Sequence, residues 1–155
     1  MVSLDMSKAF DSIQHNILLS KLQSLNFFQG ALDWFRSYLS DWQQCVWIGD
    51  AVSKVLPLDF GVPQGSILGP VLFTIYVNGL LSVPKRCLSV SYIDDCKLYL
   101  SFSPVELTMY ISALNEDLMR ISQWCCKNSL LINPDETKVL AVGVPQLLQN
   151  CHHSV

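Results

Sequence analysis

The chain has 155 residues, half of them hydrophobic, and a formal net charge of −3. This length suffices for one domain with a real core, and the low charged fraction of 15% suggests surfaces that another partner covers. Phosphate contacts dominate affinity for nucleic acids, so the acidic balance argues against a complete nucleic-acid-binding protein.

The N-terminal half alternates short strands and helices. Apolar residues at helical spacing predict three helices, over 13–25, 31–39 and 68–81. Alternating patterns predict strands over 2–4, 44–48 and 54–58. The first strand ends at Asp5, and Gly49-Asp50 is a dipeptide typical of hairpin turns. A Gly-Val-Pro-Gln-Gly loop at 61–65 precedes the third helix, whose Pro70 fits the first turn, where a missing N–H costs nothing.

The C-terminal half indicates a hairpin, a long helix and a final pair of strands. Strands are expected over 88–92, 96–100, 130–132 and 139–142, with 133–138 as a loop. Ser103 followed by Pro104 is typical of a helix start, and apolar residues at three- and four-residue steps carry that helix to about Lys127. The order of elements predicts an α+β fold, a largely antiparallel sheet with helices packed on one face.

Membrane insertion and disulfide bonds are both disfavoured. The uncharged run over 60–84 is long enough to be scored as a membrane span, but prolines and glycines interrupt it and its continuous apolar core is only 71–77. The six cysteines show no C-x-x-C spacing, and no signal peptide begins at Met1. We expect reduced thiols, an intracellular protein and no membrane partner, and we interpret Cys151-His152-His153 as part of an irregular tail.

The Asp94-Asp95 pair stands where the two strands of the C-terminal hairpin meet. Adjacent like charges between apolar strands repel each other unless water solvates them or a cation neutralises them. Mg²⁺ prefers carboxylate oxygens and often uses one or two per ion, although Asp is also an ordinary turn residue. If the first strand pairs beside this hairpin, Asp5 and Asp94 converge, and such carboxylates can hold two metal ions about 4 Å apart for phosphoryl transfer.

Taken together, the motifs resemble the palm of reverse transcriptases of the non-LTR retrotransposon type. The matching segments, in chain order, are Leu4 to Asp11, Gly61 to Ser66 with Leu68-Gly69-Pro70, Tyr92-Ile93-Asp94-Asp95, and Leu131 to Pro134 with Thr137. Each motif alone is weak to moderate evidence for the family, but their order and separations over about residues 2–143 are specific to it. The resemblance implies a polymerase palm over 1–143, followed by an irregular tail over 144–155.

For the chemistry, the resemblance implies RNA-directed DNA synthesis by a two-metal mechanism. A primer 3′-hydroxyl attacks the α-phosphate of a deoxynucleotide, with two Mg²⁺ ions, or Mn²⁺ as a substitute, stabilising nucleophile and pyrophosphate. Asp5 and Asp94 are expected to bridge both metals, Asp95 to add a supporting contact, and the backbone carbonyl of Met6 to be a further ligand. The partners of the full-length enzyme are then an RNA template, a DNA primer and deoxynucleoside triphosphates.

On the nucleotide side, the resemblance implies four further site residues. Phe10 matches the aromatic that senses the sugar 2′ position, with a core Phe beside a helix as the alternative. Gln64 and Gly65 belong to the loop that contacts nucleotide and template, with a polar loop residue as the alternative for Gln64. Tyr92 packs under the primer end or is simply a strand aromatic.

Departures from the family pattern argue for a loss of polymerase activity. Glu136 stands where family members commonly place a Lys, the nearest being Lys138, and Asn78-Gly79 stands where Asn-Asp is common. Only four residues precede Asp5, so we expect the fingers to be missing, and the sequence ends at Val155, so we also expect no thumb. Nucleic-acid binding by this fragment is therefore expected to be weak or absent. Three readings stay open: a palm active only within a longer protein, a degenerate mobile-element remnant, and a palm-derived scaffold or binding module.

Overall fold

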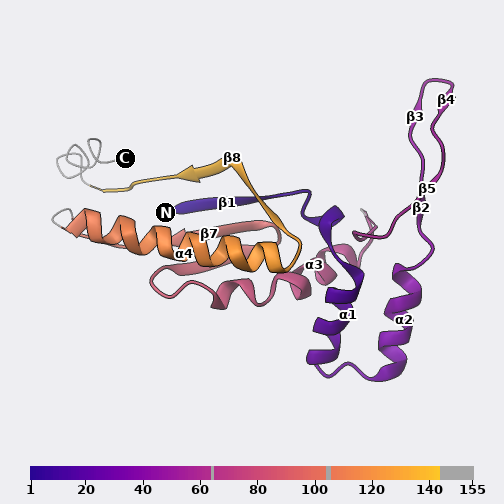
Figure 1. The fold of residues 1–155 in the computed structure, drawn as a ribbon, viewed down its shortest axis with the longest axis horizontal. Coiled ribbons are helices and arrows are strands. Elements are labelled where there is room, and N and C mark those ends of the chain that lie inside the picture. Colours follow the sequence, from indigo (N-terminus) through magenta and orange to yellow (C-terminus); the bar gives the residue numbers. More distant parts are fainter. Residues whose placement is uncertain (64, 104–105, 144–155) are drawn as a thin grey trace. The chain divides into compact units, whose positions relative to one another are not determined.

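The computed structural model describes residues 1–63, 65–103 and 106–143 (Figure 1). The chain divides into two compact units. We call Met1–Ser7 together with Asn78–Val155 the sheet unit, and Lys8–Val77 the helical unit. The tail expected over 144–155 lies outside the described residues.

A four-stranded antiparallel sheet forms the core of the sheet unit. Its strands are β1 (Val2–Ser7), β6 (Leu88–Tyr92), β7 (Asp95–Tyr99) and β8 (Leu131–Val139), in the order β6-β7-β1-β8. β6 and β7 form the expected hairpin, and β1 pairs with β7 on one side and with β8 on the other. The conditional expectation that the first strand pairs beside the hairpin is therefore met.

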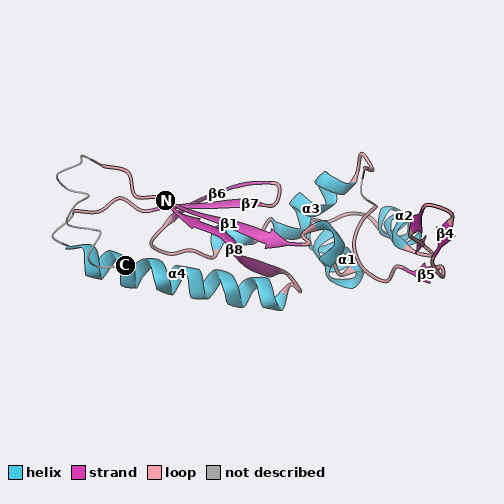
Figure 2. Ribbon diagram, turned by 90° about the horizontal axis from the view of Figure 1, so that it is seen from above, coloured by secondary structure: helices cyan, strands magenta, loops and turns pink. Residues whose placement is uncertain are grey.

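The two faces of the sheet differ in burial because strand side chains alternate between them. On β1, Val2, Leu4 and Met6 are buried, whereas Ser3, Asp5 and Ser7 are half-buried. Helix α4 (Leu107–Lys127) runs along the first of these faces, which we call the covered face (Figure 2). We call the other face, with Ser3, Asp5 and Ser7, the open face.

The covered face also explains the chemistry of two cysteines. Cys96 of β7 and Cys125 of α4 are buried. Burial raises the pKa of the Cys96 thiol to about 11. Burial, with a smaller contribution from Cys96, raises the pKa of Cys125 to about 12. Both thiols are therefore protonated at neutral pH, and they behave as small apolar core residues.

β8 corrects the expectation of two strands separated by a loop over 133–138. It is one continuous strand, whose register against β1 shifts between Ser3 and Asp5. Asp5 pairs with Asn133 while Ser3 pairs with Lys138, so β8 carries three extra residues in a bulge. Pro134 lies in this bulge and on an edge strand, the two places where a proline removes no ladder hydrogen bond that the sheet needs.

In its described residues, the helical unit contains three α-helices and a long hairpin. The helices are α1 (His15–Ser24), α2 (Gln29–Leu39) and α3 (Gly69–Val77). The hairpin consists of two short ladders, β2 (Gln43–Gln44) with β5 (Leu56–Pro57) and β3 (Trp47–Ile48) with β4 (Ala51–Val52), and it turns at Gly49-Asp50 as expected.

Helices α1 and α3 pack through buried apolar side chains and through polar contacts at Tyr76. The Tyr76 hydroxyl accepts a hydrogen bond from the Gln14 N–H, with 3.3 Å between N and O. The Lys21 ammonium donates to the Tyr76 carbonyl and lies 4.6 Å from the centre of the Tyr76 ring. These contacts place a cation near the C-terminus of α3, where the helix dipole favours one.

The end of α3 differs from the sequence-based expectation. α3 ends at Val77, and a separate 3₁₀ turn follows over Leu80–Ser82 where the helix was expected to continue to 81. The expected start of the long helix at Ser103 involves residues 104 and 105, which lie outside the described residues; α4 itself begins at Leu107. Within the described ranges, no helix is long and apolar enough to cross a membrane.

A fully buried carboxylate holds the start of β6 against α4. Asp117 accepts hydrogen bonds from the backbone N–H groups of Lys85, Arg86 and Cys87 at 2.8–2.9 Å, and from the Arg120 guanidinium at 2.6 Å. Burial alone raises the pKa of Asp117, but the hydrogen bonds from Lys85, Cys87, Arg86 and Arg120 outweigh it and hold that pKa well below its usual range. The side chain therefore stays ionised and anchors the segment that leads into the hairpin.

We predict that Asp117→Asn lowers the free energy of unfolding by about 3 kcal/mol at neutral pH, because a buried anion with four donors loses its charge. Since folding lowers the pKa of Asp117, its contribution is present above the ordinary value of 3.8 and is lost as pH falls below it. Urea unfolding at several pH values measures both effects.

The matched control is Glu116→Gln, which changes an exposed neighbour on the same helix and is expected to alter stability by less than about 0.5 kcal/mol. In acid, the difference in the free energy of unfolding between the parent chain and Asp117→Asn is expected to become smaller. A difference that stays constant down to about pH 2 would contradict a pKa lowered by folding.

Candidate active site

Asp5 lies in the middle of the sheet unit, beside the start of β7. The pairs Val2↔Leu98, Ser3↔Lys97 and Leu4↔Cys96 fix the register of β1 against β7. This ladder ends at Leu4↔Cys96, and its continuation by one step sets Asp5 opposite Asp95, the first residue of β7. Directly opposed residues on paired strands share a face, so these two carboxylates lie on the open face at neighbouring positions.

On its other side, Asp5 is oriented by β8. The Asn133 side-chain amide donates to Asp5 Oδ2, with 3.3 Å between N and O, and the two residues are opposed in the ladder. This contact occupies one carboxylate oxygen and leaves the other available to a ligand. No Lys or Arg forms an ion pair with Asp5, Asp94 or Asp95 within the described part of the chain.

Asp94 belongs to the two-residue turn between β6 and β7. The residue before it, Ile93, has φ of 56°, a left-handed conformation that is an outlier for a β-branched side chain. The Ser91 hydroxyl donates to the Ile93 carbonyl at 3.2 Å, and the ladder continues on both sides of the turn through Tyr92↔Asp95. The tight turn is therefore held in a strained conformation where the Asp-Asp pair begins, a feature that often accompanies functional sites.

The carboxylate oxygens at this site are of the chemical type that binds a hard divalent cation. Carboxylate oxygens are what Mg²⁺ prefers, and it commonly takes one or two from the protein and the rest from water or phosphate. Asp5 and Asp95 supply two such groups from neighbouring strands, and Asp94 adjoins them in sequence. Among the described residues, no three His, Cys, Asp or Glu side chains are gathered closely enough to hold a metal by themselves. Metal binding here thus calls for ligands beyond the side chains.

Two other predicted site residues lie in the sheet unit. Tyr92 is opposed to Asp95 and is 76% exposed, so its ring is open to a ligand. Met6 buries its side chain on the covered face, so only its backbone is available for the expected metal contact.

The predicted nucleotide-side residues of the helical unit are placed only in part. Phe10 stands in a 3₁₀ turn over Phe10–Ser12 and packs its ring 5.0 Å from that of Phe73 on α3, which gives it the core contact named as the alternative. Gly65 is exposed with φ of 80°, and Gln64 lies outside the described residues.

The start of the Gly-Val-Pro-Gln-Gly loop is fastened to the turn that follows β1. The Gly61 N–H donates to the Ile13 carbonyl at 2.8 Å, and the Val62 N–H donates to the Phe10 carbonyl at 3.1 Å. His15 Nε2 donates to the Gly61 carbonyl at 2.7 Å. Gly61 has φ of 85°, and a Cβ there would lie 3.0 Å from the Asp11 Cα. This position requires glycine, and sequence reasoning missed the role of His15.

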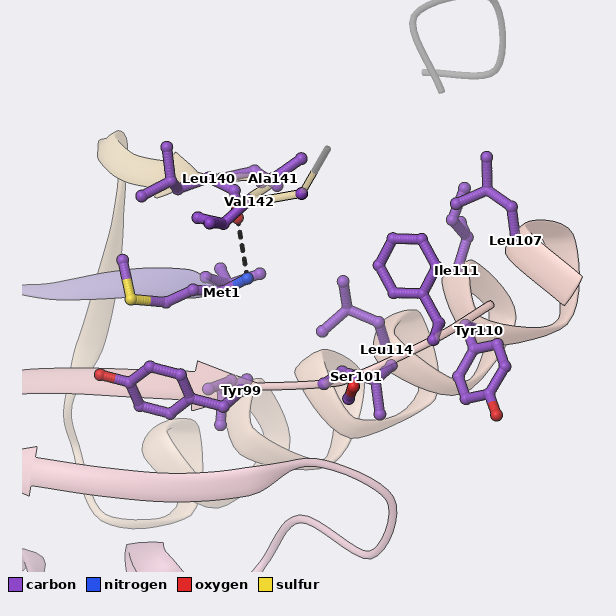
Figure 3. Close-up of a pocket in the computed structure, with 16 residues that line it drawn as sticks. Met1, Tyr99, Ser101, Leu107, Tyr110, Ile111, Leu114, Leu140, Ala141 and Val142 are labelled. Carbon is purple, nitrogen blue, oxygen red and sulfur yellow. Dashed lines mark hydrogen bonds between the residues drawn. The ribbon is translucent and has the colours of Figure 1, made fainter. Parts of the chain in front are cut away.

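A separate apolar groove of about 510 Å³ lies at the end of the sheet where Met1 stands (Figure 3). It is lined mostly by aliphatic and aromatic residues of β7, α4 and the segment after β8, and Met1 N donates to the Leu140 carbonyl at its rim. Among the residues that the structure describes, its lining contains no carboxylate. This groove is therefore distinct from the carboxylate site.

Comparison with known proteins identifies the family. Residues 1–148 match the family model described as reverse transcriptase (RNA-dependent DNA polymerase). The chain belongs to the reverse transcriptase family. This finding confirms the assignment made from the motifs.

The relatives of this reverse transcriptase chain come from mobile elements of the non-LTR type. It is 32% identical over 145 residues to the "Probable RNA-directed DNA polymerase from transposon BS" of Drosophila melanogaster, covering 88% of this chain and 16% of that protein. It is 33% identical over 138 residues to the "RNA-directed DNA polymerase from mobile element jockey" of Drosophila funebris, covering 84% of this chain and 15% of that protein. The chain therefore spans about a sixth of the length of these relatives.

A solved structure supports the fold. The "Structure of telomerase from Candida albicans in complexe with TWJ fragment of telomeric RNA" aligns with a TM-score of 0.61 at 16% identity, covering 92% of this chain and 27% of that one. The mixed fold of helices with an antiparallel sheet, expected from the sequence, is thus confirmed.

We predict that Ile93→Gly leaves the free energy of unfolding unchanged or raises it by up to about 1 kcal/mol, because glycine adopts φ near 56° without the Cβ clash. The matched control is Val90→Gly in the adjoining β6. Val90 is also β-branched and exposed, but its backbone is that of a regular strand. This variant is expected to lower the free energy of unfolding by about 1 kcal/mol. Chemical denaturation of the three proteins measures the difference. Equal losses in both variants would show that the turn is unstrained.

Proposed function

We propose that this chain is the palm of an RNA-directed DNA polymerase of the non-LTR retrotransposon type, extending over residues 1–143. The observation that carries the proposal is the juxtaposition of Asp5 and Asp95 on the open face, with Asp94 in the adjoining turn, in a chain of the reverse transcriptase family. The substrates of the whole enzyme are an RNA template, a DNA primer and deoxynucleoside triphosphates.

Asp5, Asp94 and Asp95 are proposed as the catalytic residues. Asp5 and Asp94 would hold the two divalent ions between them, Asp95 would add a supporting contact, and the Met6 carbonyl would be a further ligand. The expected ions are Mg²⁺, with Mn²⁺ as a substitute; when bound, they supply charge stabilisation for the attacking and leaving oxygens. Asn133 acts on this site by holding the Asp5 carboxylate in orientation, as outer partners of metal ligands commonly do.

The remaining proposed site residues position the nucleic acid and the incoming nucleotide. Phe10 limits the sugar at its 2′ position, and its packing on Phe73 would fix the ring for that contact. Gln64 and Gly65 contact nucleotide and template from their loop. Tyr92, exposed at the end of β6, supports the primer end. Positioning of this kind provides much of the rate enhancement in phosphoryl transfer.

Glu136 favours a second candidate, a remnant or scaffold without catalysis. Its carboxylate is exposed within the β8 bulge, at the place where the family commonly has a Lys. β1 separates β8 from the β6–β7 hairpin in the sheet, and we propose that Glu136 does not reach Asp94. The presence of all three aspartates favours the polymerase reading over the scaffold.

We predict that the chain binds Mn²⁺ through these aspartates, as measured by the loss of the free-ion electron paramagnetic resonance signal. Asp5→Asn, and likewise Asp94→Asn combined with Asp95→Asn, weaken binding by about tenfold or more, because such ions are held by only one or two protein carboxylates. Asp50→Asn, in the exposed turn of the other hairpin, is the control and leaves binding unchanged. Equal Mn²⁺ binding by the parent chain and all variants would contradict a metal site at these aspartates.

We also predict that the 155-residue chain alone does not extend a primer on an RNA template with Mg²⁺ or Mn²⁺. It covers only about a sixth of its relatives, and a net charge of −3 gives it few phosphate contacts. Extension by the parent chain that disappears with Asp94→Asn and Asp95→Asn would contradict this expectation.

In a complementary experiment, this chain replaces the matched segment of the jockey polymerase to give a hybrid enzyme. The hybrid is expected to extend the primer, and the Asp94→Asn, Asp95→Asn substitution in the hybrid is expected to abolish extension. A folded hybrid that is inactive from the start would favour the remnant over the polymerase.

A further inference from the structure

The bulge in β8 decides which of its side chains reaches the open face. Asn133 and Lys138 are five residues apart, an odd separation that places side chains on opposite faces of a regular strand. Here Asn133 opposes Asp5 and Lys138 opposes Ser3, and both of these β1 residues belong to the open face. The extra residues of the bulge have therefore reversed the phase of the strand and turned Lys138 away from α4.

A second lysine reaches the same row from the other side. Lys97 of β7 also opposes Ser3, so the open face carries Lys97, Ser3 and Lys138 side by side on three neighbouring strands. The two lysine Cα atoms are about 10 Å apart, two strand spacings, and their flexible four-carbon stems allow both ammonium groups to reach one ligand above Ser3. Within the described residues, neither lysine forms an ion pair with an acidic side chain.

This lysine row lies one step from the carboxylates. Ser3 and Asp5 are two residues apart on β1, as are Lys97 and Asp95 on β7, so the rows are separated by about 6.6 Å. Val90 and Tyr92 of β6, 55% and 76% exposed, extend the two rows. An anion held by the lysines would thus lie next to the carboxylate row and beside an exposed aromatic side chain.

We infer that Lys97 and Lys138, with Ser3 between them, form a phosphate-binding site for the backbone of a nucleic-acid strand that lies across the open face toward Asp5 and Asp95. Lysine ammonium groups bind phosphate as compact charges, and exposed aromatic side chains such as Tyr92 suit bases of any identity. The inference rests on the proposed function, since it supplies the strand on which the carboxylates act. It gives Lys138 a phosphate-binding role that the carboxylate of Glu136 cannot perform.

The test follows backbone amide signals of the isotope-labelled chain by NMR, without metal, as three ligands are added up to millimolar concentration. The ligands are a short DNA–RNA duplex with a recessed 3′ end, a deoxynucleoside triphosphate and pyrophosphate. We expect the duplex to shift the signals of Ser3, Lys97 and Lys138. A duplex that leaves them unmoved, or a response confined to triphosphate or pyrophosphate, would overturn the assignment to a nucleic-acid backbone.

Variants separate this site from general charge effects. Lys97→Gln with Lys138→Gln is expected to reduce the slope of log affinity against log salt by about 0.7–0.9 for each lysine removed. Lys97→Arg with Lys138→Arg retains the parent slope. Lys85→Gln with Lys127→Gln changes the net charge equally at exposed positions outside the sheet and is the matched control. A control that loses as much slope as the Lys97, Lys138 variant would refute the site.

The metal site is read separately in the same samples. Mn²⁺ added without duplex is expected to broaden the signals of Asp5, Asp94 and Asp95. Broadening without a response to the duplex leaves the proposed metal site standing and overturns the lysine site. The reverse result upholds the phosphate site and contradicts the metal site.

Discussion

β1 is hydrogen-bonded on both sides, and the rest of the sheet unit depends on this constraint. A central strand cannot slip by one residue without turning Val2, Leu4 and Met6 from the core to the open face, so its register is fixed by burial. That register sets Asp5 beside Asp95 on one strand and Asn133 on the other. The location of the candidate site is therefore a consequence of core packing, with no contribution required from the site residues themselves.

The hairpin is held in place by an interaction of a different kind. Asp117 is a fully buried carboxylate, and the desolvation of its charge would be unfavourable without its four donors. Because three of these donors are successive backbone N–H groups, the segment before β6 has little freedom relative to α4. The tip of the hairpin, in contrast, is short and strained at Ile93. A rigid base and a strained tip together restrict where Asp94 can lie.

Much of this arrangement could be predicted from the sequence, and the exceptions have physical causes. Apolar periodicity located all three strands of the sheet that alternate regularly, and the motif order gave the family. β8 was divided wrongly, because Pro134 and the polar residues around it are typical of a loop, and only the pairing with β1 shows that they form a bulge. Asp117 was missed since an Asp within an amphipathic helix resembles a solvated residue, and its partners lie about 30 positions away in the chain.

The lysine row depends on the same irregularity that sequence reasoning missed. Strand alternation alone would send Lys138 to the covered face, away from the carboxylates. The bulge instead places Lys138 on the open face, next to a row of carboxylates that repel any approaching phosphate. An acidic chain can hold a polyanion beside its aspartates only if cations offset that repulsion locally, because exposed charges are screened beyond about 10 Å. Bound metal can offset it at the carboxylate row, and Lys97 and Lys138 can offset it one row away. The three extra residues of the bulge thus place a cation beside the carboxylates, where it can offset their repulsion of a polyanion.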